Sequence, residues 1–118
     1  EEEAGATHGT ADWLQKFQRR LARSPEQVIR YAWGGSPLWM APPPAEMVNG
    51  IWPPCCRHCS APRAFELQVL PTLVSQMCEA SGMVLQEVGW GTACVYTCSQ
   101  DCQADGPCEE FVVVQPAV

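Results

Sequence analysis

Two pairs of cysteines place the strongest constraint on how this chain can fold. The first pair is Cys56 and Cys59, separated by two residues, and the second is Cys98 and Cys102, separated by three. In each pair a tight turn can bring both thiols to one point, and two such pairs supply the four sulfurs that structural zinc prefers. The spacing therefore predicts a zinc ion that joins two segments lying far apart in the sequence.

Two neighbouring residues are alternative ligands for the first pair. Cys55 would give a pair with Cys59 at i, i+4, and His58 could bind through a ring nitrogen. Both alternatives stay open, although the spacing favours Cys56. A shell of four protein ligands leaves no position for a water molecule, so we expect a structural rather than a catalytic metal.

The remaining cysteines do not extend this pattern. The chain has eight cysteines in 118 residues, and such a count is also found in small secreted domains with disulfides. However, Cys78 lies on an amphipathic segment and Cys94 lies inside an apolar run. Buried thiols in such places behave as small hydrophobes. We therefore expect reduced cysteines and a metal, not a disulfide scaffold.

The length and charge of the chain argue against direct binding to nucleic acid and favour a single domain. The chain is long enough for one ordinary domain, and its net charge is −6 with Lys16 as the only lysine. Because nucleic acid affinity rests on Lys and Arg, we expect no direct nucleic acid binding. No apolar run is long enough for a membrane span. Residues 1–11 are expected to form a disordered acidic leader, and residues 12–118 one zinc-binding domain that is a monomer.

The N-terminal third favours helices. Residues 12–23 carry apolar side chains at helical spacing, with Asp12 as the expected N-cap. Ser24 followed by proline and glutamate predicts a second, short helix over 24–31. The run 37–40 then favours a short strand or an extended segment.

The rest of the chain favours strands around one further helix. Residues 41–54 are rich in proline and are expected to form a loop. Strands are predicted over 64–70, 88–97 and 111–114, and a helix from Pro71 to Ser81. The fold class is therefore α+β, with N-terminal helices packed on a mostly antiparallel sheet and the zinc site at the ends of strands.

No catalytic set is recognisable in the sequence, so we expect a protein that is not an enzyme. Trp39 lies beside the proline-rich loop, and tryptophan is enriched where proteins bind one another. Glu109 and Glu110 precede the last strand, where adjacent side chains point to opposite faces. These three residues are the predicted partner-binding residues.

Short runs spaced along the chain form a further pattern. They are Phe17–Arg20, Pro25–Tyr31, Gly35–Trp39, Cys56–Cys59, Arg63–Gln68, Leu70–Leu73, Trp90–Thr92, Val95–Cys98 with Cys102, and Glu109–Gln115. In this order they resemble the C-terminal domain of the programmed cell death protein 2 family, and most closely its programmed cell death protein 2-like branch. Ser60 departs from the glycine usual in that family, at a turn where positive φ would suit glycine better.

The resemblance implies a role in protein binding. Members of the family act as chaperones or adaptors for a newly made small-subunit ribosomal protein, and they support subunit assembly and traffic between nucleus and cytoplasm. The expected partner is then a basic ribosomal protein of the small subunit, and the expected location is the cytoplasm and nucleus. The family name suggests an alternative, a regulatory adaptor in apoptosis or cell-cycle control.

Overall fold

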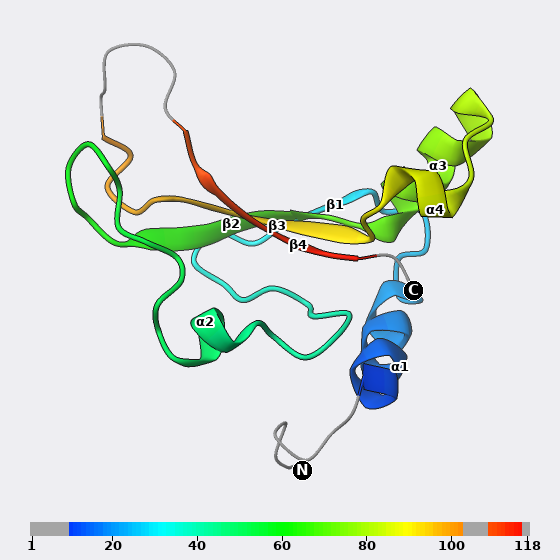
Figure 1. The fold of residues 1–118 in the computed structure, drawn as a ribbon, viewed down its shortest axis with the longest axis horizontal. Helices are drawn as coiled ribbons and strands as arrows, with labels where there is room; N and C mark the ends of the chain where they lie inside the picture. Colours follow the sequence, from blue (N-terminus) through cyan, green and yellow to red (C-terminus); the bar gives the residue numbers. More distant parts are fainter. Residues whose placement is uncertain (1–9, 103–108, 117–118) are drawn as a thin grey trace.

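A four-stranded antiparallel sheet forms the centre of the molecule (Figure 1). The computed structural model describes residues 10–102 and 109–116, so residues 1–9 of the predicted leader lie outside it. The strands, which lie side by side in sequence order, are β1 (Ile29–Tyr31), β2 (Arg63–Val69), β3 (Thr92–Cys98) and β4 (Phe111–Gln115). The helices are α1 (Thr10–Leu21), α2 (Ala45–Val48), α3 (Pro71–Ser81) and α4 (Leu85–Val88). The predicted α+β class is confirmed.

Helix α1 begins earlier than predicted and packs at one end of the sheet. It starts at Thr10, so Asp12 lies in the first turn instead of at the N-cap. A carboxylate there still suits the positive end of the helix dipole. The side chain of Phe17 is buried with Met40 and Leu70, and this small cluster joins the helix to the chain that follows β2.

The second predicted helix, over 24–31, is wrong, because β1 occupies its C-terminal half. The N-terminal half is a turn in which the N–H of Gln27 donates to the carbonyl of Ser24 at 3.1 Å. The chain then pairs with β2, and Ile29 lies opposite Val69. Its β-branched and aromatic side chains suit a strand, and this tertiary pairing outweighs the local helix-start signal.

The other predicted elements differ from the structure mainly at their ends. The strand over 64–70, the helix from Pro71 and the strand over 111–114 are confirmed as β2, α3 and β4. The strand predicted from residue 88 begins at Thr92 instead, because α4 and a turn at Gly89 precede it. The proline-rich loop contains α2, and the run 37–40 is extended without strand pairing.

The main core lies on one face of the sheet, which we call the covered face. Its buried side chains come from the three longer strands and are those of Phe65, Cys94, Tyr96 and Val113. The chain between β1 and the first cysteines runs beneath this face in Figure 1 and packs on it through Ala32, Trp39, Met47 and Trp52. No helix in the described part of the chain is long and apolar enough to cross a membrane.

Three buried polar side chains hold the covering chain at one end of the sheet, which we call the amide end. The amide of Gln68 donates to the carbonyl of Leu38 at 2.7 Å and accepts from its N–H at 2.9 Å. Gln68 also donates to the hydroxyl of Thr92, which donates in turn to a β2 carbonyl. Gln115 accepts from the N–H groups and donates to carbonyls within residues 40–42. The amide and hydroxyl groups of Gln68, Thr92 and Gln115 therefore all have partners within the chain.

Candidate metal centre

The first cysteine turn lies just before β2. The N–H of Ser60 donates to the carbonyl of Cys56 at 2.9 Å, and the N–H of Cys56 donates to the carbonyl of Ala61 at 2.8 Å. These bonds fold the chain back, so that Cys56 and Cys59 can face the same point. Ser60 takes a φ of 65°, the left-handed conformation that the family's glycine would adopt more easily. The turn is thus kept in spite of the substitution.

The second cysteine turn continues from the end of β3. The N–H of Asp101 donates to the carbonyl of Cys98 at 3.2 Å, and Asp101 itself takes a φ of 49°. The two turns are joined directly, because the N–H of Ser99 donates to the carbonyl of Pro62 at 3.0 Å. The only non-glycine residues with positive φ in the described part of the chain therefore lie in these two turns. Such strain is typical of functional sites.

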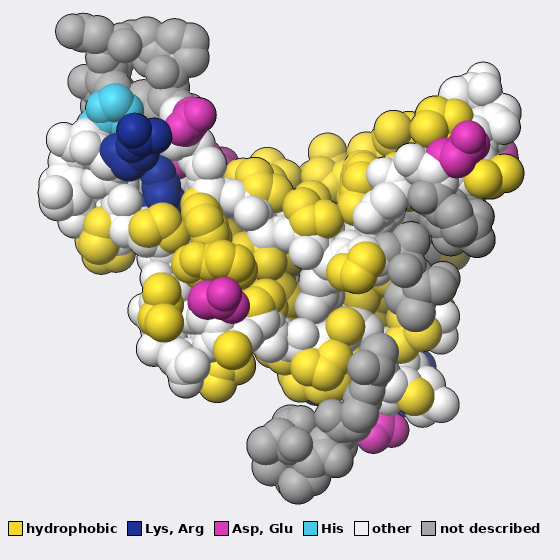
Figure 2. Space-filling view, in the orientation of Figure 1, with side chains coloured by type: hydrophobic (Ala, Val, Ile, Leu, Met, Phe, Trp, Pro, Cys, Tyr) yellow, Lys and Arg dark blue, Asp and Glu magenta, His cyan; other side chains and the backbone are white. Residues whose placement is uncertain are grey.

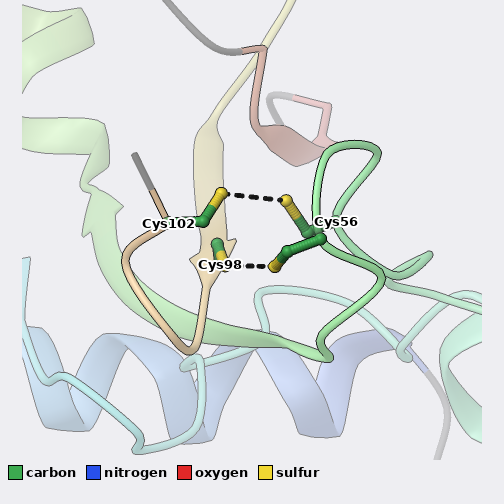
Figure 3. A group of neighbouring side chains, drawn as sticks. Cys56, Cys98 and Cys102 are labelled. Atoms are coloured by element: carbon green, nitrogen blue, oxygen red, sulfur yellow. Dashed lines mark hydrogen bonds between the residues drawn. The ribbon is translucent and has the colours of Figure 1, made fainter. Parts of the chain in front are cut away.

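The turns bring together the four cysteines predicted from the spacing. The sulfurs of Cys56, Cys59, Cys98 and Cys102 all lie within 4.8 Å of one another. The two shortest separations join different turns, at 3.6 Å between Cys56 and Cys102 and 3.5 Å between Cys59 and Cys98 (Figure 3). Zinc–sulfur bonds of about 2.3 Å in a tetrahedron place the sulfurs roughly 3.8 Å apart. The four thiols could therefore hold a metal ion.

The electrostatics of the cluster favour a cation at its centre. The pKa of the Cys56 thiol is lowered to about 6, because backbone N–H groups of Cys59 and His58 donate to its sulfur. Backbone donors at Cys102 and Gln100 likewise lower the pKa of Cys98. The pKa of Cys102 is instead raised to about 12, first by its hydrogen bond with Cys56. The pKa values of Cys56 and Cys98 are thus lowered, while that of Cys102 is raised because a second thiolate would lie close to the first. A bound cation would stabilise all of the thiolates and remove this repulsion.

The two alternative ligands lie outside this group. Cys55 and His58 are both exposed, and neither has a ligand atom in the cluster. The seven described cysteines are all free of disulfides, and Cys78 and Cys94 lie elsewhere. Cys108 falls outside the described residues. Among the described residues the structure therefore supports the ligand set that the spacing favoured.

Two arginines tie the first turn to the start of β4. The guanidinium of Arg57 lies 2.8 Å from the carboxylate of Glu109, and both side chains are exposed. The side chain of Arg63 is only 4% exposed, lies 3.4 Å from the carboxylate of Glu110 and donates to the carbonyl of Pro54 at 3.1 Å. Glu109 and Glu110, predicted to bind a partner, thus have internal ion pairs at the edge of the cysteine site.

Trp39 occupies a different part of the molecule from the two glutamates. Its ring is half-buried against the main core, and it also lines a cavity of about 360 Å³ beside α1. The three predicted partner-binding residues therefore do not form one surface, and their role in binding stays a prediction.

Sequence reasoning missed a second cavity, next to the cysteines. It has a volume of about 420 Å³, and it opens onto the cluster itself, because Cys56, Cys98 and Cys102 belong to its lining. The rest of the lining includes Tyr31, Trp33 and three carboxylates, those of Glu66, Asp101 and Glu110. The cavity could not be predicted once residues 24–31 were assigned to a helix, because it is the pairing of β1 with β2 that places Tyr31 beside Glu66. The alternation of apolar and polar residues in Ile29–Tyr31 was the available signal.

The fold and the cysteine cluster define a small α+β domain with a site that could hold a metal ion. The family model for the C-terminal domain of programmed cell death protein 2 matches residues 11–116, so the chain belongs to this family. The family expected from the sequence is confirmed. No solved structure matches the chain.

Several curated relatives are similar over most of the chain. "Programmed cell death protein 2-like" of Gallus gallus is 42% identical over 86% of the chain and 26% of the relative, and that of Homo sapiens is 39% identical over 85% and 27%. The "Probable 20S rRNA accumulation protein 4" of Schizosaccharomyces pombe is 33% identical over 73% of the chain and 22% of the relative. The chain thus spans about a quarter of the length of the relatives it matches.

Proposed function

We propose that this chain is a zinc-stabilised domain without catalytic activity that binds a basic protein of the small ribosomal subunit during ribosome production. The observation that carries the proposal is the cluster of four cysteines in a chain of this family. It would act in the cytoplasm and nucleus, where subunits are made and matured.

Zinc suits the cluster better than magnesium or calcium. Four sulfur ligands at tetrahedral separations favour zinc, whereas magnesium and calcium prefer oxygen. A shell filled by Cys56, Cys59, Cys98 and Cys102 leaves no open position, so the metal would stabilise the fold and activate no water. Zinc, when bound, would supply only this cross-link between the end of β3 and the turn before β2.

Two observations support a ribosomal partner. One relative is named a probable 20S rRNA accumulation protein, which links that protein to ribosomal RNA. The net charge of −6 favours association with a basic protein and disfavours nucleic acid. Since the relatives are about four times as long, the chain would supply one part of their function.

Affinity purification tests this function. The tagged chain is recovered from reduced lysate beside two variants, Cys98→Ser in the cluster and Cys55→Ser next to it, and bound proteins are identified by mass spectrometry. We expect a small-subunit ribosomal protein to be enriched by the wild-type chain and by Cys55→Ser, and to be lost with Cys98→Ser.

Two results would overturn the proposal. If no ribosomal protein is enriched by the wild-type chain, the ribosomal role is wrong. If apoptotic or cell-cycle regulators are enriched instead, with the same dependence on Cys98, the chain is the alternative regulatory adaptor.

A further inference from the structure

Burial alternates strictly along β3 and β4. In β3, Thr92, Cys94, Tyr96 and Cys98 are buried on the covered face, and the residues between them are only half-buried. In β4, Val113 and Gln115 are buried, whereas Val112 and Val114 are 48% and 52% exposed. Every buried residue of the described strands therefore lies on one face, and no residue that these strands place on the other face is buried to the same degree.

The strand register assigns the side chains of this second face, which we call the open face. Two rows of paired residues run across the four strands on this face. One row, from β4 to β1, is Val112, Val95, Leu67 and Tyr31. The other row is Val114, Ala93, Val69 and Ile29. The central part of the open face thus consists of Ile29, Tyr31, Leu67, Val69, Ala93, Val95, Val112 and Val114, and the pair Ala64 and Thr97 continues it toward the cysteines. A solvated face of an antiparallel sheet normally carries polar residues, but these are nearly all apolar.

The shape of the molecule leaves this face accessible. In Figure 1 the covering chain with α2 lies below the sheet and α3 and α4 rise at one end. Figure 2 shows hydrophobic side chains along the upper side, in the hollow between the lobe of the cysteine turns and the lobe of α3 and α4. An exposed apolar surface of this kind on a small domain is typical of a protein-binding site.

The acid-lined cavity adjoins one end of the open face, because Tyr31 belongs to both. The rings of Tyr31 and Trp33 are 63% and 48% exposed. Glu66 accepts hydrogen bonds from the hydroxyls of Tyr31 and Thr97, which fix its carboxylate at the wall. The cavity lining contains no lysine or arginine, although Arg63 lies 3.4 Å from Glu110, and it includes the thiols of Cys56, Cys98 and Cys102. Carboxylates beside aromatic rings suit the cation of a lysine or arginine side chain.

We propose that the open face and the cavity together dock one segment of a partner protein in which apolar side chains lie next to a lysine or arginine. The apolar side chains cover the valines and Ile29, and the cation enters between Glu66 and the rings of Tyr31 and Trp33. The inference rests on the proposed function as a protein-binding domain, and it names the surface and the chemistry of the bound segment.

Charge makes a second copy of this chain a poor occupant. The chain carries 13 acidic residues and only 7 lysines and arginines. Of the basic residues, Lys16, Arg20 and Arg30 line the other cavity, and Arg57 and Arg63 are paired with glutamates. The remaining two, Arg19 and Arg23, are exposed on α1 and just after it. Two copies meeting at the open face would place their acid-lined cavities near each other, which costs free energy.

The test uses two valine-rich peptides of ten residues that differ at one central position, which is arginine in the first peptide and its neutral analogue citrulline in the second. Each is titrated into the zinc-loaded, 15N-labelled chain, and amide shifts are followed by NMR. We expect the arginine peptide to shift amides of the open face and of Glu66, and to bind about tenfold more tightly than the citrulline peptide, as the loss of a charge-assisted hydrogen bond predicts.

Conservative variants locate the binding. Val112→Thr with Val114→Thr keeps the shape of the exposed strand. Glu66→Gln removes the charge, and its amide can accept from one of the two hydroxyls and donate to the other. Each change is expected to weaken binding of the arginine peptide several-fold. Glu79→Gln, an exposed position on α3, is the control that leaves binding unchanged. Shifts confined to other surfaces, or equal binding of both peptides, would overturn the proposal. So would a dimer in light scattering that the double threonine variant abolishes.

The two proposals fail in different ways. If the peptides fail while the wild-type chain still enriches a ribosomal protein, the docking surface is wrong and the function stands. If the arginine peptide binds as expected but no ribosomal protein is recovered, the surface stands and the ribosomal role is wrong.

Discussion

At each end of the sheet a loop is held against the strands, but different side chains hold it at the two ends. At the amide end, Gln68, Thr92 and Gln115 hold residues 38–42 against the strands. At the other end, which we call the cysteine end, Cys56 and Cys59 meet Cys98 and Cys102 (Figure 3). Each end joins a loop to the sheet through polar side chains, which are all buried at the amide end, whereas Cys59 at the other end is exposed.

The two ends differ in whether their side chains can satisfy one another and the loop without a bound ligand. An amide has both donors and acceptors, so Gln115 can satisfy N–H groups and carbonyls of the same loop without any ligand. Four thiols offer one kind of group, and once ionised they repel one another. The amide end is therefore expected to form from the chain alone, whereas the cysteine end depends on a cation.

The largest expected effect follows from removing a sulfur ligand. Cys98→Ser should abolish tight zinc binding and destabilise the domain by several kcal/mol, because the binding free energy of structural zinc, on the order of 10 kcal/mol, contributes to folding. Zinc content by mass spectrometry and thermal unfolding with and without chelator measure both effects.

Cys55→Ser is the matched control for this change. Cys55 is exposed and adjacent to the ligands but not one of them, so its loss should leave zinc content and unfolding temperature unchanged. Equal loss of zinc in both variants would mean that the ligand set is wrong. If a chelator does not change the unfolding of the wild-type chain, the cysteine end does not depend on a metal, and the proposed difference between the two ends is wrong.

A smaller effect is expected at the amide end. Gln115→Leu removes a side chain that bonds with the N–H groups of Met40 and Ala41 and the carbonyls of Ala41 and Pro42. Leaving such groups buried and unpaired should cost about 3 kcal/mol in the free energy of unfolding, measured by urea denaturation. Zinc content should not change.

The control for the amide end is Gln76→Leu, an exposed position on α3 that should be nearly neutral. If Gln115→Leu also releases zinc, the two ends do not act independently and the comparison fails.

The same contrast explains how much the sequence could predict. The cysteine site was predictable, because its ligands are rare residues whose local spacing carries the information. The roles of Gln68 and Gln115 were not, since their partners lie about 30 and 75 positions away and any glutamine could have pointed to solvent. Strand β1 was misassigned for a related reason: it is a strand because it pairs with β2, while the helix-start signal just before it, at Ser24, favours a helix.

The smallest effect is expected from the exposed ion pair at the cysteine end. Arg57 and Glu109 lie 2.8 Å apart, but their side chains are 72% and 82% exposed. Solvent-exposed pairs contribute about 0.5 kcal/mol or less, so Arg57→Gln should barely change urea unfolding. A double-mutant cycle with Glu109→Gln, repeated in high salt, isolates the pair. A coupling energy that is well above this value and persists in high salt would show that ion pairs, and not only the thiols and their metal, hold the cysteine end together.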